Sequence, residues 1–251
     1  MSGIKVILLD GSKIELNKGA TLYDAALKIN QRLGKEAIAG IVNGVKRDLN
    51  HTLENNDHIE ILTFSSPKGK EIYHHSSSHI MAQAVQELFP EAKFAIGPAI
   101  KDGFYYDFDI DRSFTPEDMV VIEKKMKEII EKDLPFKRIE VNKEEANQIF
   151  KKKKEKYKLE LLEDIQDDMV TLYQQGDFID LCRGPHVSST GKIKAFKLLS
   201  IAGAYWRGNE KNKMLQRIYG ISFDKKSELD NYLKLLEEAK KRDHRKLGKD
   251  L

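Results

Sequence analysis

The first part of the chain alternates apolar and polar residues in the manner of a small β-sheet. Residues 4–16 predict a hairpin, because two runs of strand-forming residues flank the turn pair Asp10-Gly11. A helix is expected next. Thr21 is suited to its N-cap, apolar side chains recur on one helical face, and Gly34 is expected to end it.

Two further strands are expected to complete this unit. Residues 38–44, which end in the turn pair Asn43-Gly44, and residues 57–63 are both rich in strand formers. Strand-strand-helix-strand-strand within residues 1–64 predicts a ubiquitin-like β-grasp roll, in which one helix crosses a mixed sheet. Residues 65–71 collect Ser, Pro and Gly and predict a linker.

The pattern then changes to longer amphipathic helices separated by short apolar strands with glycine-containing turns. This pattern predicts an α+β fold, with a larger α+β domain over residues 65–224 and a helical extension over residues 225–251. The helices are expected at residues 75–89, 116–133, 143–157 and 225–247.

Composition excludes several classes of protein. With 40% hydrophobic and 33% charged residues, the 251-residue chain can bury a core and does not resemble a disordered chain. No stretch approaches the roughly 18 consecutive apolar residues of a membrane-spanning helix, and the start lacks a signal-peptide pattern. We therefore expect a cytoplasmic location without membrane contact. The single cysteine, Cys182, excludes an internal disulfide.

Charge is almost balanced, with 43 basic and 40 acidic side chains. Residues 1–64 carry eight of each, so the basic excess lies in the remainder, notably in residues 151–158 and 239–249. Such runs are usually solvated helix faces, but they are also consistent with a polyanionic partner for the second part of the chain.

Two pairs of chemically matched residues stand out. His75 and His79 are four residues apart, which places both imidazoles on one face of a helix. Cys182 and His186 repeat this spacing in a segment whose Gly and Pro predict a tight loop. Together they could supply three or four zinc ligands. Spacing alone leaves a metal site, a metal-free site and simple packing open.

Other polar residues could contribute to the same pocket. Lys158 stands just before a strand-like run, and Asp180 lies on the same side as Cys182 if that segment is extended. Trp206 is favoured as a core residue. The chain has no GxSxG, P-loop, HExxH or GxGxxG motif. What remains is a reaction of water activated by His, Lys or a metal.

Five segments together resemble a known family. They are HSSSH (75–79), AIGPAIKDGFYYDFD (95–109), DLCRGPHV (180–187), KLLSIAGAYWRGNEKNKMLQRIYG (197–220) and EEAKKRDHRKLG (237–248). These segments resemble the amino-terminal part of threonyl-tRNA synthetases, and the resemblance covers essentially the whole chain. It implies a TGS domain at residues 1–64, an editing domain at 65–224 and a linker helix at 225–251 that leads toward an aminoacylation core outside this chain.

The activity implied by this resemblance is hydrolytic: removal of serine from mischarged tRNA specific for threonine. ATP, and the zinc of the aminoacylation core, would belong to that core. The resemblance implies the tRNA acceptor end as partner, with a monomeric fragment and a homodimeric parent enzyme. The amino-terminal domain has no charge excess that would indicate strong RNA binding of its own, so its sequence leaves its role open; orienting the rest of the chain is one alternative.

The resemblance also implies roles for particular residues. His75 and Lys158 are expected to position and activate the attacking water, although Lys156 lies two residues away and could take the place of Lys158. The pocket would be lined by His79, Tyr106, Asp180, Cys182 and His186, with Asp180 suited to the substrate ammonium group.

Metal is the sharpest alternative. Related alanine-specific editing domains use such a His/Cys set to bind zinc, whereas the threonyl type is expected to work without metal. If zinc is bound, His75, His79, Cys182 and His186 are the expected ligands. Two further hypotheses stay open: a non-catalytic tRNA-binding module, and a free-standing zinc-dependent aminoacyl-tRNA hydrolase.

Overall fold

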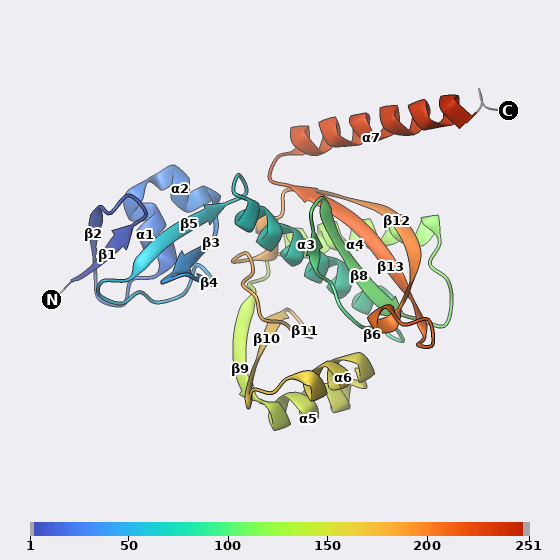
Figure 1. Ribbon diagram of the computed structural model, residues 1–251, viewed down its shortest axis with the longest axis horizontal. Helices are drawn as coiled ribbons and strands as arrows, with labels where there is room; N and C mark the ends of the chain where they lie inside the picture. Colours follow the sequence, from blue (N-terminus) through green and yellow to red (C-terminus); the bar gives the residue numbers. More distant parts are fainter. Residues whose placement is uncertain (1–2, 248–251) are drawn as a thin grey trace.

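The computed structural model describes residues 3–247 and has an α+β fold, as predicted. Figure 1 shows a small amino-terminal domain, a larger domain built around helix α3, and a long carboxy-terminal helix at the edge of the larger domain. We use "amino-terminal domain" for residues 3–64 and "larger domain" for residues 65–225.

The amino-terminal domain is a five-stranded sheet crossed by helices, which confirms the predicted roll. The strands follow the order β2-β1-β5-β3-β4, in which β1 and β5 are parallel and the other pairs antiparallel. Its elements are β1 (Ile4–Leu8), β2 (Lys13–Leu16), α1 (Leu22–Ile29), α2 (Gln31–Glu36), β3 (Ala37–Val42), β4 (Val45–Arg47) and β5 (His58–Thr63).

The turns fall where the sequence predicts them. Gly11 lies between β1 and β2 at φ 81°, and both residues of the Asn43-Gly44 turn have positive φ, at 50° and 83°. Asparagine tolerates this left-handed backbone and glycine adopts it freely, so the pair suits a tight hairpin between β3 and β4.

The predicted single helix after Thr21 is two helices. Thr21 caps α1 through a capping box with Asp24, as expected for its position. Asn30 then takes an extended backbone, and its side chain accepts a hydrogen bond from the Arg32 N–H to start α2. Gly34 lies inside α2, so the prediction that it ends the helix is wrong.

The predicted linker is also wrong, because most of it is helical. Helix α3 (Pro67–Leu88) begins within the Ser/Pro/Gly-rich stretch, with Ser66 as N-cap and Pro67 in its first turn. Proline at that position lacks only an N–H that the first turn leaves unpaired, so it favours a helix start.

A shared apolar cluster joins the two domains. Ile38, Ile41 and Phe64 of the amino-terminal domain belong to the same buried cluster as Ile72 and Tyr73 of α3. The rings of Phe64 and Tyr73 meet edge to face, with centroids 4.9 Å apart. The amino-terminal domain is therefore held against α3 by buried side chains.

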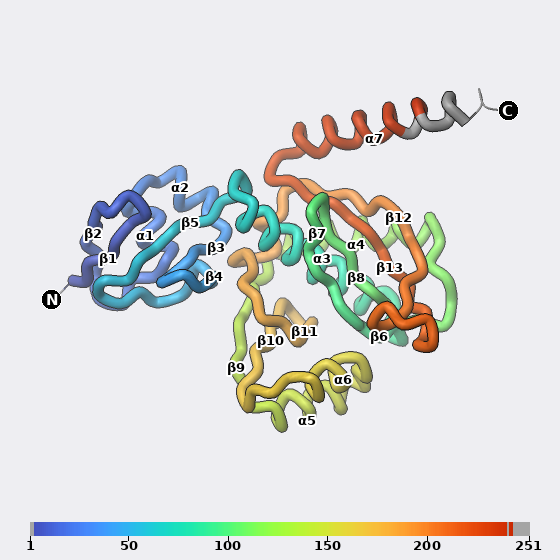
Figure 2. Tube along the Cα trace, in the orientation of Figure 1, coloured from blue at the N-terminus to red at the C-terminus, as the bar shows by residue number. Residues whose placement is uncertain are grey.

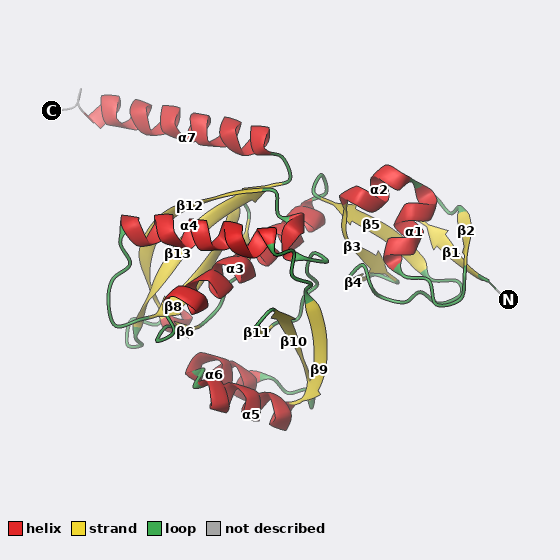
Figure 3. Ribbon diagram, turned by 180° about the vertical axis from the view of Figure 1, so that it is seen from behind, coloured by secondary structure: helices red, strands yellow, loops and turns green. Residues whose placement is uncertain are grey.

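The main sheet of the larger domain is antiparallel, and α3 packs on one of its faces together with helix α4 (Pro116–Glu131), as Figure 3 shows from behind. The sheet order is β12-β13-β8-β6, and β7 pairs with β8. The strands are β6 (Lys93–Phe94), β7 (Ala99–Ile100), β8 (Gly103–Asp109), β12 (Ala195–Tyr205) and β13 (Met214–Phe223). Figure 2 follows the same path as a continuous tube.

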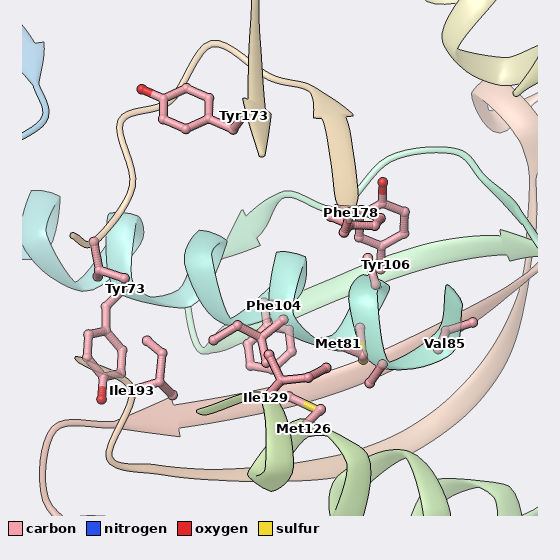
Figure 4. Close-up of a cluster of buried hydrophobic side chains, with 14 of the residues drawn as sticks. Tyr73, Met81, Val85, Phe104, Tyr106, Met126, Ile129, Tyr173, Phe178 and Ile193 are labelled. Carbon is pink, nitrogen blue, oxygen red and sulfur yellow. The ribbon is translucent and has the colours of Figure 1, made fainter. Parts of the chain in front are cut away.

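Alternation along β8 places three aromatic side chains on one face of the strand. Phe104, Tyr106 and Phe108 are fully buried and face the helices. Figure 4 shows Phe104 beside Met126 and Ile129, while Tyr106 lies next to Phe178. Tyr106 thus places a hydroxyl at the inner face of the sheet, where the helices cover it.

A second sheet carries two short helices. Strands β9 (Lys137–Asn142), β10 (Met169–Gln175) and β11 (Phe178–Leu181) pair in the order β11-β10-β9 and pack against α5 (Lys143–Lys153) and α6 (Lys156–Asp164). The helix predicted over residues 143–157 stops at Lys154, which has a left-handed backbone at φ 57°. Lys158 therefore lies on a helix and not before a strand.

The last helix, α7 (Lys226–Leu247), packs on β12 and β13 through Leu229, Tyr232 and Leu233. The basic run at 239–249 falls largely on this helix, and its last two residues lie outside the described residues. Trp206 is a core residue, as predicted: it is buried, and its indole N–H donates to Glu160. Within residues 3–247, no helix combines the length and apolarity needed to cross a membrane.

Phe64→Ala tests the apolar junction between the domains. Phe64 is 6% exposed, and truncation of a buried Phe removes apolar contact and leaves a cavity, so the free energy of unfolding should fall by about 3 to 5 kcal/mol in urea denaturation. The matched control is Val120→Ala on α4, whose side chain is 66% exposed and should change stability by less than about 0.5 kcal/mol. Equal effects of the two changes would contradict a buried junction.

Candidate functional site

Helix α3 presents two histidines to one side of its axis. His75 and His79 are one turn apart, with ring centroids 4.9 Å apart. His79 is buried and His75 is partly exposed. The helix can lie deep in the domain because Ser76, Ser77 and Ser78 are small, and the hydroxyls of Ser76 and Ser77 donate to carbonyls of the preceding turn. The predicted helical spacing is therefore confirmed.

The loop after β11 brings the second pair to the first. Cys182 Sγ lies 3.6 Å from His75 Nε2 and 3.2 Å from His186 Nε2. The Gly184 N–H donates to the same sulfur at 3.2 Å, and Gly184 has a φ of 66° that favours glycine. The loop therefore folds back on itself and points both side chains at α3.

One donor atom from each of His75, His79, Cys182 and His186 lies within 4.8 Å of the other three. His186 is held on its other side, since its Nδ1 lies 3.0 Å from Ser76 Oγ and its ring stacks on Phe136 at a centroid distance of 4.8 Å. Ser76 and Phe136 were not predicted from the sequence. Neither has a chemical signature, and only the fold brings them to the loop.

A buried charged group adjoins the His/Cys cluster. Lys158 Nζ and Asp180 Oδ1 form an ion pair at 2.5 Å, and both side chains are 4% exposed. The Tyr106 hydroxyl donates to Asp180 Oδ2 at 2.7 Å, and Lys158 donates to that hydroxyl oxygen at 3.0 Å. His79 Nε2 lies 3.7 Å from the same carboxylate. The two groups therefore form one continuous polar site.

The start of α6 fixes Lys158 in this site. Glu155, just before the helix, accepts a hydrogen bond from the Phe94 N–H, and Lys158 donates to the Ala95 carbonyl at 2.6 Å. Lys156 points elsewhere: it is 52% exposed and pairs with Asp109. Lys158, and not Lys156, therefore lies beside Asp180 and Tyr106 in the structure.

Burial sets the protonation of the site. It lowers the pKa of His75 to about 4 and lowers the pKa values of His79 and His186 well below their ordinary range. Burial also raises the pKa of the Cys182 thiol to about 12. Near neutral pH the cluster therefore holds three neutral imidazoles and a thiol.

A cavity of about 250 Å³ opens beside this cluster. His75 forms part of its wall, so this imidazole can meet a molecule in the cavity while it contacts Cys182 behind it. The lining residues come from α3, the Gly184-Pro185 turn, the segment before β8 and the amino-terminal domain: Glu71, Ile72, His75, Gly184, Pro185, Pro98, Ala99 and Lys46.

Comparison with known proteins finds two family matches and several similar ligases. Residues 4–63 match the TGS domain family. Residues 170–219, which include β11, Cys182 and His186, match the family described as the threonyl and alanyl tRNA synthetase second additional domain. Threonine–tRNA ligases of Desulforamulus reducens and Acetivibrio thermocellus are 56% and 54% identical to the chain over 249 residues, 99% of its length.

The chain corresponds to the amino-terminal TGS and editing-domain region of threonine–tRNA ligases. It spans 39% of the length of those two relatives. The threonine–tRNA ligase of Caldanaerobacter subterraneus subsp. tengcongensis is also 56% identical, over 98% of the chain. We use "TGS domain" for the amino-terminal domain and "editing domain" for the larger domain, of whose His/Cys cluster Cys182 and His186 lie in the matched range.

The His/Cys cluster offers ligand types that bind zinc, and the distances between its donor atoms are close to those of a zinc site. Three imidazoles and one thiol are a ligand set that zinc accepts, and tetrahedral coordination at about 2.0–2.3 Å separates neighbouring donor atoms by roughly 3.3–3.7 Å. The two distances from Cys182, 3.2 and 3.6 Å, are close to that range, whereas the widest separation in the cluster is within 4.8 Å. The geometry therefore accommodates zinc after a small adjustment.

The neutral histidines make the stability of the editing domain depend on pH. The folded-state pKa of His75 is about 4, below its ordinary 6.5, so the unfolded chain binds more protons between these values. The free energy of unfolding should therefore fall as pH drops from about 6.5 to about 4, with about 2 to 3 kcal/mol from His75.

The measurement is urea denaturation at several pH values in the presence of a chelator, for the unchanged chain and His75→Gln. Gln cannot be protonated, so the variant should lose less stability over this interval. Parallel curves for the two proteins would show that His75 titrates normally.

Proposed function

We propose that this chain hydrolyses the ester bond of mischarged aminoacyl-tRNA, and that its substrate is serine on the tRNA for threonine. The observation that carries the proposal is the position of His75. It lines the cavity, lies 3.6 Å from Cys182 and belongs to a buried polar site in an editing-domain family. In this proposal the cavity receives the esterified end of the tRNA.

The chemistry of the two amino acids explains the need for this site. Serine lacks one methyl group of threonine, and a missing methyl group is worth only about 1 to 3 kcal/mol of discrimination in a binding pocket. A synthetic site alone therefore charges some serine. A second site that removes serine from the tRNA restores accuracy.

In the proposed reaction, neutral His75 accepts a proton from a water molecule as the water oxygen attacks the ester carbonyl carbon. The tetrahedral intermediate then collapses, the bond between that carbon and the ribose oxygen breaks, and the His75 imidazolium returns the proton to the leaving oxygen. Lys158 supplies a fixed positive charge that stabilises the negative charge developing on the substrate.

The other residues are proposed to shape and polarise the pocket. His79, Tyr106, Cys182 and His186 surround the reacting group. Asp180 is the proposed partner of the substrate ammonium group, and both of its oxygens already contact Lys158 or Tyr106. The substrate would therefore have to share Asp180 with Lys158.

The same residues could hold zinc. His75, His79, Cys182 and His186 would be the ligands, and a bound zinc would act as a Lewis acid toward water or the ester carbonyl. Repulsion between Lys158 and a dication is weakened here, because Lys158 is paired with Asp180. We nevertheless propose hydrolysis without metal, because neutral His75 lines the cavity and can itself accept a proton from water.

Beyond the site, we propose a cytoplasmic protein that meets the acceptor end of tRNA through lysine and arginine contacts to phosphate. ATP and threonine activation are proposed for a separate aminoacylation domain of the whole ligase. The chain itself is proposed to be monomeric and the whole ligase dimeric.

The central test is hydrolysis of seryl and threonyl esters on the same tRNA. The unchanged chain should hydrolyse the seryl ester faster, and His75→Ala should lose about 100-fold or more of kcat while its affinity for tRNA persists, because a general base contributes about that factor. His74→Gln is the matched control. It removes the neighbouring imidazole, which contacts Ser222 on the other side of α3.

Two outcomes would contradict this assignment. If the unchanged chain binds tRNA but hydrolyses neither ester, the editing activity is wrong and a tRNA-binding module remains. If activity needs one tightly held zinc per chain and disappears with a chelator, His75 is a metal ligand and not the water activator.

Lys158→Met and Lys156→Met separate the two neighbouring lysines. Lys158→Met leaves Asp180 buried without its partner, so it should lower kcat at least about 10-fold and the free energy of unfolding by about 3 to 5 kcal/mol. Adding Asp180→Asn should restore stability but not hydrolysis. Lys156→Met removes an exposed ion pair and should cost less than about 1 kcal/mol with hydrolysis retained. The reverse ranking in hydrolysis would assign the role to Lys156.

A further inference from the structure

The TGS domain reaches the editing site through one carboxylate. Asp48 directly follows strand β4 of the TGS domain, and its two oxygens contact two different parts of the editing domain. Oδ1 accepts a hydrogen bond from the His186 backbone N–H at 2.9 Å, and Oδ2 accepts one from the Tyr173 hydroxyl at 2.7 Å. Hydrogen bonds to a charged acceptor are about twice as strong as neutral ones.

Tyr173 is pressed against the same loop. Its ring lies 4.5 Å from the His186 ring at an interplanar angle of 64°. Its hydroxyl fits against Gly184 so closely that a Cβ atom there would lie 2.1 Å from the hydroxyl oxygen. In Figure 4 this hydroxyl points away from Phe178 and Tyr106, toward the side of the blue TGS domain. Asp48 therefore fixes the loop directly at His186 and, through Tyr173, at Gly184.

The TGS domain holds this carboxylate in a defined place. The apolar cluster around Phe64 and Tyr73 fixes the domain against α3, and Lys46 pairs with Glu71 of α3 at 2.7 Å. Lys46 is two residues before Asp48 and lines the cavity beside His75. Lys46 of β4 thus forms part of the cavity wall.

We propose that Asp48 is a positioning residue for hydrolysis, and that the TGS domain is thereby a structural part of the editing site. Asp48 holds the loop from Gly184 to His186 so that Cys182 and His186 face His75. This inference rests on the proposed function for its kinetic consequence, but the ordering of the loop can be measured without any substrate.

The test compares Asp48→Ala with a variant that removes another contact between the same domains. Lys192 Nζ donates to the Lys35 carbonyl of the TGS domain at 3.3 Å and touches neither Tyr173 nor His186, so Lys192→Met is the matched control. In seryl-tRNA hydrolysis by the full chain, Asp48→Ala should lower kcat about 10- to 100-fold with KM changed less than about twofold. Lys192→Met should retain both values.

Asp48→Asn and Tyr173→Phe keep the proposal testable if Asp48→Ala does not fold. Asn retains an acceptor for the His186 N–H, so it should recover part of the lost kcat. Tyr173→Phe removes only the second hydrogen bond and should give an intermediate loss. Adding Asp48→Ala to Tyr173→Phe should cost less than the product of the two single losses, because both act on one loop.

Alkylation of Cys182 by iodoacetamide, followed by intact mass, reports the loop itself. Cys182 is the single cysteine and is 8% exposed, so release of the loop should speed its modification at least about 10-fold in Asp48→Ala and leave Lys192→Met unchanged. If the unchanged chain lacks hydrolysis but alkylation responds as expected, the proposed function fails and the positioning role stands. Unchanged alkylation and hydrolysis in Asp48→Ala, or equal effects in Lys192→Met, would overturn it.

Discussion

The buried ion pair between Lys158 and Asp180 is the interaction on which the site depends. Neither charge can be removed from water alone without a large cost in free energy, so each requires the other. Lys158 comes from α6 and Asp180 from β11, while Tyr106, which bonds to both, comes from the main sheet. This buried contact therefore joins the second sheet and its helices to the first, together with the exposed Lys156–Asp109 pair and the hydrogen bond from Trp206 to Glu160. The His/Cys cluster lies directly beside it, and partial or full burial keeps its imidazoles neutral.

The two sheets and α3 each contribute different residues to the site. The main sheet supplies a rigid floor, α3 supplies two imidazoles at helical spacing, and the loop after β11 supplies the remaining donors. Most of these residues lie on regular elements, which place side chains more precisely than free loops do. The exception is the segment from Cys182 to His186, and it is this segment that contacts the TGS domain through Asp48.

Regular patterns in the sequence predicted much of the fold. The hairpin turns, the capped helix after Thr21, α4, the basic extension and the core position of Trp206 all have local signals. The errors have physical causes. The helix after Thr21 is split because the Asn30 side chain caps a second helix, and residues 65–71 are mostly helical because Pro67 is well suited to a first helical turn. The helix predicted over residues 143–157 ends early because Lys154 has a left-handed backbone. The HxxxH and CxxxH pairs revealed the candidate site. The hydrogen bonds of Asp48 and Ser76 to the loop could not be predicted, because they join residues more than 100 positions apart.

The three consecutive serines of α3 limit how this region of the chain can evolve. Ser76 bonds to the loop at Val187, Ser77 to Ser222 of β13, and Ser78 to the Gly97 carbonyl, so each faces a different neighbour at close range. A larger residue at any of the three positions would clash with the loop, with β13 or with the segment before β8. Alanine would fit the space, but the former hydrogen-bond partner of the serine would then be buried without a partner, which costs free energy. The size and polarity of the residues at these three positions are therefore restricted by the loop, the sheet and the segment before β8, although three serines in sequence give no sign of burial.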